Sequence, residues 1–367
     1  MSLRDLAPEN IRAIAPYVPG KPIADLAREL GMTEADIVKM ASNENPLGSS
    51  PKALAAVRLA LDGLACYPDG SGFDLKAVLA RKLGVGPEHF ILGNGSNDVL
   101  ELVARAFLTR ADSAVFSRHS FMVYALAVQA VGAKAIEVSA REFGHDLDAM
   151  RAAIRPDTKV VFLANPNNPT GTFLPWSEIF AFIERVPPGV LVVLDEAYGE
   201  YLPPELRSPS VSWIAAHPNV IVSRTLSKAY GLAGLRVGFG VGHPDVIEVM
   251  NRVRQPFNVN HLALVAAAAA LDDHEFLEAS RRNNSEGRTQ LEAGFRKLGL
   301  SWIPSLGNFV AVRVGDAARV YESLLKQGVI VRPVANYGMP EYLRVTIGKP
   351  PENARFLAAL ELAVKAG

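Results

Sequence analysis

The sequence lacks several features, and each absence argues against a class of protein. It has one cysteine in 367 residues, Cys66, so no internal disulfide can form and a reducing compartment is expected. Charge of neither sign is in excess, because 38 Lys and Arg balance 38 Asp and Glu, so we expect no nucleic-acid partner. The seven histidines show no metal-binding spacing, and no metal site is predicted.

Long hydrophobic runs are also missing. The longest one, at residues 262–271, is rich in alanine and too short to span a bilayer. The first residues carry charge and no apolar stretch, which argues against a secretion signal. We therefore expect a cytoplasmic location without a membrane partner.

What the sequence does contain is enough apolar residue, 49%, for a large core. Between about residue 90 and residue 240, short apolar runs alternate with helical patterns and end in polar or glycine-rich loops. Because these runs are apolar on both faces, they indicate an α/β fold with a mainly parallel sheet that helices cover on both sides. The predicted strands lie at residues 90–92, 113–116, 135–138, 160–163, 190–194 and 220–223.

The pattern changes after a long helical region at residues 258–298. Strands are predicted at residues 302–304, 309–314, 329–333 and 342–347, with helices at 317–326 and 352–366. This is typical of a smaller α+β domain. We predict a proline-rich N-terminal arm (1–40), a large domain (41–260) and a small C-terminal domain (261–367).

The run at residues 223–236, Ser-Arg-Thr-Leu-Ser-Lys-Ala-Tyr-Gly-Leu-Ala-Gly-Leu-Arg, places one amine among hydroxyls and glycines. The amine of Lys228 can form a Schiff base with an aldehyde. Thr225, Ser227 and Arg236 can hold a phosphate. Pyridoxal 5'-phosphate carries both groups, although Lys228 by itself would be interpreted as a surface lysine.

A second motif, Asp-Glu-Ala-Tyr at 195–198, follows five apolar residues. Asp195 is expected at a strand end and partly buried, where a carboxylate needs a partner. The N–H of a pyridinium ring is a suitable one, because the pair keeps the ring an electron sink. Tyr198 is placed to reach the phenolic oxygen of that ring. The motif alone equally allows Asp195 to cap the next helix and Tyr198 to be a core residue.

Two loops complete the set. The loop at 165–171, Asn-Pro-Asn-Asn-Pro-Thr-Gly, is stiffened by its prolines and can present Asn168 as a donor to the O3' atom of the cofactor. The loop at 93–98 places Gly95, Ser96 and Asn97 before an apolar helix, where backbone N–H groups bind anions. The simpler alternatives are an Asn-Pro turn and a helix cap. The second loop matches neither the dinucleotide nor the Walker A pattern.

Together, the motifs at 165–171, 195–198 and 227–236 resemble the class II, fold-type I pyridoxal-phosphate aminotransferases. The histidinol-phosphate aminotransferase branch is the most similar, through Ala-Pro-Tyr at 15–17, Asn-Glu-Asn-Pro at 43–46, Tyr-Pro-Asp at 67–69 and Tyr-Leu-Arg-Val-Thr-Ile-Gly at 342–348. The resemblance implies a seven-stranded sheet, pyridoxal phosphate as cofactor and a homodimer with shared active sites. It also implies amino transfer from histidinol phosphate to 2-oxoglutarate in histidine biosynthesis.

The resemblance assigns a role to each motif residue. Lys228 would carry the cofactor and move a proton, Asp195 would pair the ring nitrogen, and Asn168 and Tyr198 would bind O3'. The phosphate would be held by Gly95, Ser96, Asn97, Thr225, Ser227, Arg236 and, from the neighbouring subunit, Tyr67. Phe121 would stack on the ring. Arg344, flanked by Asn43, would bind the substrate α-carboxylate or its equivalent, and Tyr17 and Arg332 the distal end of the substrate.

Two departures from the family pattern keep other substrates open. Phe121 stands where many relatives have a tyrosine, and residues 349–351 read Lys-Pro-Pro where some relatives carry an arginine or acidic residues. Both leave room for phenylalanine or another aromatic amino acid as the amino donor. The same scaffold also supports decarboxylases and lyases. A ligand-sensing module without catalysis is a further alternative, but such modules are usually fused to a DNA-binding domain, for which we expect no room in this sequence.

Overall fold

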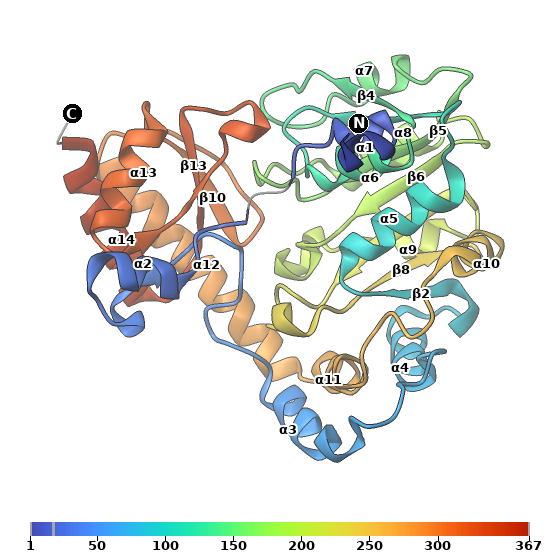
Figure 1. Cartoon of the computed structure of the whole chain (residues 1–367), viewed down its shortest axis with the longest axis horizontal. Helices are drawn as coiled ribbons and strands as arrows, with labels where there is room; N and C mark the ends of the chain where they lie inside the picture. Colours follow the sequence, from blue (N-terminus) through green and yellow to red (C-terminus); the bar gives the residue numbers. More distant parts are fainter. Residues whose placement is uncertain (1, 17–18, 366–367) are drawn as a thin grey trace.

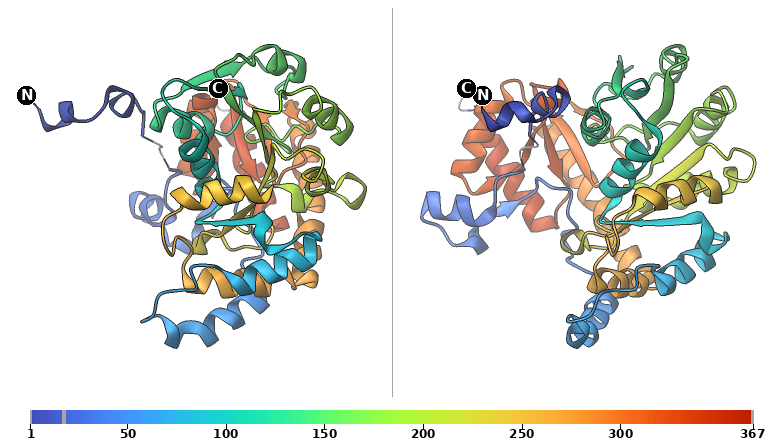
Figure 2. Two further views of the ribbon diagram at one scale, coloured as in Figure 1. Left: turned by 90° about the vertical axis from the view of Figure 1, so that its right-hand side faces the viewer. Right: turned by 45° about the vertical axis from the view of Figure 1, so that its right-hand side comes forward.

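The computed structural model describes residues 2–16 and 19–365 (Figure 1, Figure 2). Its centre is a seven-stranded sheet in the order β2-β8-β7-β6-β5-β3-β4. Every neighbouring pair is parallel except the two made by β8, which runs antiparallel to β2 and β7. This confirms the predicted mainly parallel sheet. The strands are β2 (Phe90–Gly93), β3 (Ser113–Ser117), β4 (Lys134–Val138), β5 (Thr158–Ala164), β6 (Leu191–Asp195), β7 (Val220–Thr225) and β8 (Gly238–Gly242).

Helices cover both faces of this sheet. Alternate residues of each strand point to opposite faces, so each strand contributes side chains to two cores. On β5, Val161 and Leu163 pack in one core cluster and Val160 and Phe162 in the other. The first cluster includes residues of α3 (Pro51–Ala60), α4 (Phe73–Leu83), α7 (Leu147–Ala152), α8 (Trp176–Ile183), α9 (Ser210–Trp213) and α11 (His261–Leu271). The second includes residues of α5 (Ser96–Phe107), α6 (Val123–Ala130) and α10 (Pro244–Val253).

The C-terminal part is a separate layer with its own core. Its antiparallel sheet has the order β12-β13-β10-β9, and three helices accompany it. The strands are β9 (Trp302–Ile303), β10 (Phe309–Arg313), β12 (Arg332–Pro333) and β13 (Tyr342–Thr346), and the helices are α12 (His274–Lys297), α13 (Ala317–Lys326) and α14 (Pro350–Lys365). The single strand predicted at 329–333 is wrong, because β11 (Val329–Ile330) pairs instead with β1 (Val38–Lys39) of the N-terminal segment.

The N-terminal segment contains a 3-10 helix (Leu3–Leu6), then α1 (Glu9–Arg12), α2 (Ile23–Leu30) and β1. Leu26, Ala27 and Ile37 form a small cluster with Ile330, so α2 and β1 pack on the C-terminal part, whereas α1 contacts α6 beside the large sheet (Figure 1). Helix α11 packs against α3 and α4, on the side of the large sheet. The domain division at residues 40 and 260 stays a prediction. Among the described residues, no helix is long and apolar enough to cross a bilayer.

Candidate active site

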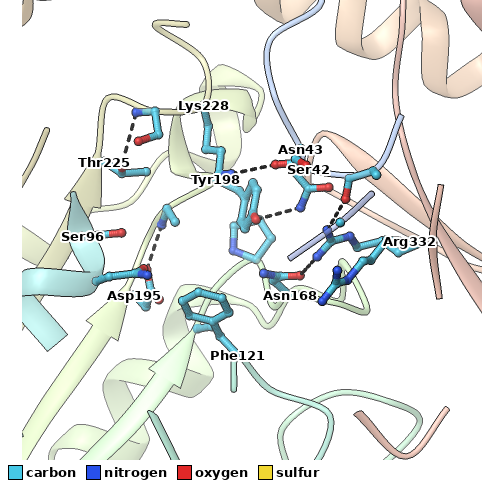
Figure 3. Close-up of a pocket in the computed structure, with 18 of the residues that line it drawn as sticks. Ser42, Asn43, Ser96, Phe121, Asn168, Asp195, Tyr198, Thr225, Lys228 and Arg332 are labelled. Carbon is cyan, nitrogen blue, oxygen red and sulfur yellow. Dashed lines mark hydrogen bonds between the residues drawn. The ribbon is translucent and has the colours of Figure 1, made fainter. Parts of the chain in front are cut away.

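One pocket lies where the carboxyl ends of β5, β6 and β7 meet the start of α5, residues 41–43 and strands β12 and β13 (Figure 3). It holds about 210 Å³, which suits a small molecule. Thirteen of the sixteen residues predicted from the sequence line it: Asn43, Ser96, Asn97, Phe121, Asn168, Asp195, Tyr198, Thr225, Ser227, Lys228, Arg236, Arg332 and Arg344. The structure therefore brings together motifs that lie far apart in the sequence.

Lys228 lies three residues beyond the end of β7 and points into the pocket. Its Nζ donates to the carbonyl oxygen of Ser42 at 3.2 Å and lies 5.9 Å from the centre of the Tyr198 ring. Burial, and after it the nearby charge of Arg344, lowers the pKa of this amine to about 8. The neutral form of Lys228, which is the nucleophilic form, is therefore more populated near neutral pH than in an ordinary lysine.

Asp195 is the last residue of β6 and is 4% exposed. Its Oδ2 accepts a hydrogen bond from the Tyr124 hydroxyl at 2.7 Å, and its Oδ1 accepts one from the backbone N–H of Ala197 at 3.2 Å. Burial raises the pKa of this carboxyl to about 6, although the hydrogen bond from Tyr124 acts in the opposite direction. A buried carboxylate in this state is suited to a cationic N–H partner. Tyr124 was not predicted as a site residue from the sequence. The feature that could have indicated it is its position three residues after Phe121.

Hydrogen bonds connect the polar side chains of Asn43, Tyr198, Asn168 and Arg344 in pairs along another part of the pocket. Tyr198 accepts a hydrogen bond from Asn43 Nδ2 at 2.9 Å, and burial raises the pKa of its phenol to about 12. Arg344 is 7% exposed and donates from Nη1 to Asn168 Oδ1 at 2.7 Å and from Nη2 to the Ala41 carbonyl at 2.8 Å. The amide oxygen of Asn168 accepts from Arg344, and its amide nitrogen can donate to a cofactor at the same time.

The remaining corner is built to hold an anion. Arg236 has a φ of 58° and donates from Nη1 to Ser227 Oγ at 3.4 Å, while the N–H of Ser227 donates to Thr225 Oγ1 at 3.1 Å. Gly95 does not line the pocket, but it precedes α5 with a φ of 84°, and a Cβ there would lie 2.6 Å from Arg236 Nη2. A guanidinium, hydroxyls and a helix N-terminus suit a phosphate group.

Tyr67, Arg332 and Tyr17 complete the set of predicted residues. Tyr67 does not line the pocket of its own chain: it is 83% exposed, and its ring stacks 4.7 Å from that of Phe257. Arg332, on β12, lines the pocket beside Gly20. Tyr17 lies outside the described residues. Within the described ranges, no group of three or more His, Cys, Asp or Glu side chains is placed to hold a metal ion.

The pocket thus fits pyridoxal phosphate: Lys228 suits the aldehyde, Asp195 the ring nitrogen, and the Arg236 corner the phosphate. Residues 35–360 match the family model described as Aminotransferase class I and II. The chain therefore belongs to this family of pyridoxal-phosphate enzymes and is an aminotransferase.

Individual proteins similar to this chain narrow the similarity within the aminotransferase family. The chain is 63% identical over 354 residues to histidinol-phosphate aminotransferase 1 of Thiobacillus denitrificans, covering 96% of this chain and 92% of that protein. It is 60% identical over 363 residues to histidinol-phosphate aminotransferase of Methylobacillus flagellatus, covering 99% and 98%. Among solved structures, histidinol-phosphate aminotransferase from Sinorhizobium meliloti in complex with pyridoxal-5'-phosphate superposes with a TM-score of 0.89 at 29% identity, covering 98% and 97%.

Proposed function

We propose that this enzyme transfers the amino group of L-histidinol phosphate to 2-oxoglutarate in histidine biosynthesis. The observation that carries the proposal is the 63% identity, over nearly the whole length of both chains, to a protein of that name. The arginines of the pocket support it, because both substrates are anions: one carries a phosphate and the other two carboxylates. Arg344 and Arg332 lie on the same side of the pocket, on neighbouring strands of the C-terminal sheet.

When bound, pyridoxal phosphate supplies an aldehyde that captures amines and a ring that withdraws electrons from the carbon bearing the amine. Lys228 Nζ moves the proton between that carbon and the cofactor, and such acid–base catalysis typically contributes about 10²–10⁴-fold. The lowered pKa of Lys228 makes this amine a base near neutral pH. Asp195 holds the proton at the ring nitrogen.

The other side chains orient the reactants. Arg344 binds the carboxylate of 2-oxoglutarate next to the reacting carbon, or the phosphate at the equivalent position of histidinol phosphate. Its guanidinium is already fixed by Asn168 and Ala41, so little side-chain entropy is lost on binding. Arg332 and Tyr17 bind the distal end of either substrate, and Phe121 packs on the cofactor ring.

The assembly we propose is a cytoplasmic homodimer in which Tyr67 reaches the cofactor phosphate of the neighbouring subunit. Support comes from the exposure of Tyr67, of the Phe257 ring stacked on it, and of three large apolar side chains within eight residues of it in sequence: Leu59, Leu64 and Phe73. Exposed large apolar side chains are typical of a subunit interface when they are contiguous. Mixing subunits that carry Tyr67→Ala with subunits that carry Lys228→Ala tests this: shared sites predict that the mixture regains activity that each variant lacks, and unshared sites predict none.

The substrate is tested by a panel of amino donors with 2-oxoglutarate, comparing kcat/KM for L-histidinol phosphate, phenylalanine and tyrosine. We expect the highest value for histidinol phosphate, with glutamate formed in equal amount to donor consumed. A higher value for phenylalanine would support the aromatic alternative that Phe121 leaves open. Release of carbon dioxide or pyruvate without glutamate would contradict amino transfer altogether.

A further inference from the structure

Tyr124, on α6, lines the pocket, and its hydroxyl donates a hydrogen bond to the carboxylate that is expected to meet the cofactor ring. Tyr124 is fully buried, and its Oη lies 2.7 Å from Asp195 Oδ2. Tyr124 belongs to none of the motifs predicted to bind the cofactor or the substrate.

The ring of Tyr124 is fixed on two sides. It stacks on Phe162 of β5, with centres 4.9 Å apart and planes 7° from parallel, and it meets Phe121 edge-on at 6.0 Å and 87°. These two ring contacts restrict the movement of the Tyr124 hydroxyl. The direction of the hydrogen bond is also fixed, because a carboxylate only accepts and the phenol must donate. Burial and the charge of Asp195 hold the pKa of Tyr124 well above its usual value, so the donor proton is retained.

We propose that Tyr124 is a positioning residue for Asp195: its hydroxyl keeps the carboxylate ionised and holds it in the orientation that the cofactor ring meets. This role of Tyr124 concerns cofactor binding. It is therefore independent of which amino donor the enzyme prefers.

Two opposite effects set the pKa of the buried Asp195 carboxyl. Burial favours its neutral form, and each donated hydrogen bond favours its charged form. Asp195 has two such donors, the Tyr124 hydroxyl and the Ala197 backbone N–H. Removing the hydroxyl leaves one donor, so the pKa of Asp195 must rise from about 6 towards or above neutrality. A protonated Asp195 no longer attracts the protonated nitrogen of the ring.

The test is Tyr124→Phe, which keeps both ring contacts and removes only the hydroxyl. Pyridoxal phosphate is titrated into cofactor-free protein, and its dissociation constant is measured between about pH 5 and pH 9. Hydrogen bonds to charged groups are among the stronger ones, so we expect binding about 10- to 100-fold weaker near pH 7. We also expect the loss of affinity on acidification to begin at a higher pH than in the wild type.

A double-mutant cycle with Asp195→Asn separates this role from a general structural one. In the Asp195→Asn background there is no charge to stabilise, so adding Tyr124→Phe is expected to change the dissociation constant less than about twofold. Tyr201→Phe is the matched control, since Tyr201 is buried nearby and its hydroxyl lies 3.5 Å from Asn308 Nδ2 rather than next to Asp195. Wild-type affinity and pH profile in Tyr124→Phe, or an equal loss in both backgrounds, would overturn the proposal.

Discussion

Gly238, the first residue of β8, makes the closest backbone approach in the phosphate corner. A Cβ at this position would lie 2.5 Å from the backbone nitrogen of Ser96, 2.7 Å from the carbonyl carbon of Gly95 and 2.8 Å from the carbonyl oxygen of Arg224. All three atoms are backbone, so no side chain can rotate away. Gly238→Ala therefore forces β8 and the start of α5 apart by about an ångström to restore ordinary carbon contacts of about 3.5 Å.

Two effects of Gly238→Ala are expected. Overpacking of this kind typically costs about 1–3 kcal/mol, which should appear as a lower free energy of unfolding in urea. The shift also moves the N–H of Ser96, a donor in the phosphate corner, and misplacing such a group by about 1 Å can cost up to about 10²-fold. We expect the dissociation constant of pyridoxal phosphate to rise at least about tenfold.

Gly234→Ala is the matched control, because a Cβ there meets nothing within 4 Å and the residue lies four positions before Gly238. Its stability should stay within about 0.5 kcal/mol of the wild type, as for other surface substitutions. The reasoning is refuted if Gly238→Ala unfolds at the same urea concentration as Gly234→Ala and binds pyridoxal phosphate equally well.

Three further predictions concern single side chains. Lys228→Ala should abolish turnover while keeping the circular dichroism spectrum of the wild type; normal kinetics would remove Lys228 from the mechanism. Arg344→Lys loses the two guanidinium hydrogen bonds to Asn168 and Ala41. We therefore expect kcat/KM for 2-oxoglutarate to fall about 10- to 100-fold in steady-state assays. An unchanged value would contradict the role of Arg344 in carboxylate binding. Burial raises the pKa of the Glu200 carboxyl from 4.5 to about 7. Between these two pH values the folded chain keeps a proton that the unfolded chain has lost. The free energy of unfolding of the wild type therefore falls as the pH rises through about 7. Glu200→Gln should therefore be more stable than the wild type at about pH 8, by up to about 3 kcal/mol in urea unfolding, and no more stable at about pH 4; equal differences at both pH values would refute this.

The pocket could be anticipated because parallel strands end at one edge of a sheet. Asn168, Asp195 and Lys228 each follow a buried apolar run, and these runs are the neighbouring strands β5, β6 and β7. Strand order did not have to be known, since any order of parallel strands brings their carboxyl ends to the same side. Local pattern was therefore sufficient for this part of the site.

Strand β8 was missed because Gly-Phe-Gly-Val-Gly does not have the composition of a strand. Its glycines are explained by tertiary contacts: a Cβ on Gly240 would lie 2.9 Å from Val99 Cγ1 and 3.0 Å from Ile91 Cγ2. Helix α5 and strand β2 approach so closely that only glycine fits. The hydrogen bond between Tyr124 and Asp195 was missed for a related reason, because it depends on how α6 is rotated against β6.

The strand predicted at 329–333 shows a third limit. The run reads Val-Ile-Val-Arg-Pro and begins with three β-branched residues, yet β11 pairs with β1 and β12 pairs with β13, in two different sheets. The pairing partner of β11 lies almost 300 positions earlier in the chain, and nothing local in the run records it. Pairing over such a distance is decided by the assembled cores rather than by the run itself.

The strip at residues 40–43 has consequences for how the protein is made. Its contacts reach across the chain: Met40 O accepts from the N–H of Thr346, Ala41 O accepts from Arg344, and the N–H of Asn43 donates to Thr346 Oγ1, 303 positions away. Ribosomes add about 5–20 residues per second, so this strip emerges roughly 15–60 s before its partners. A nascent chain interrupted before residue 344 would hold the lysine and the phosphate corner but no finished wall for the substrate.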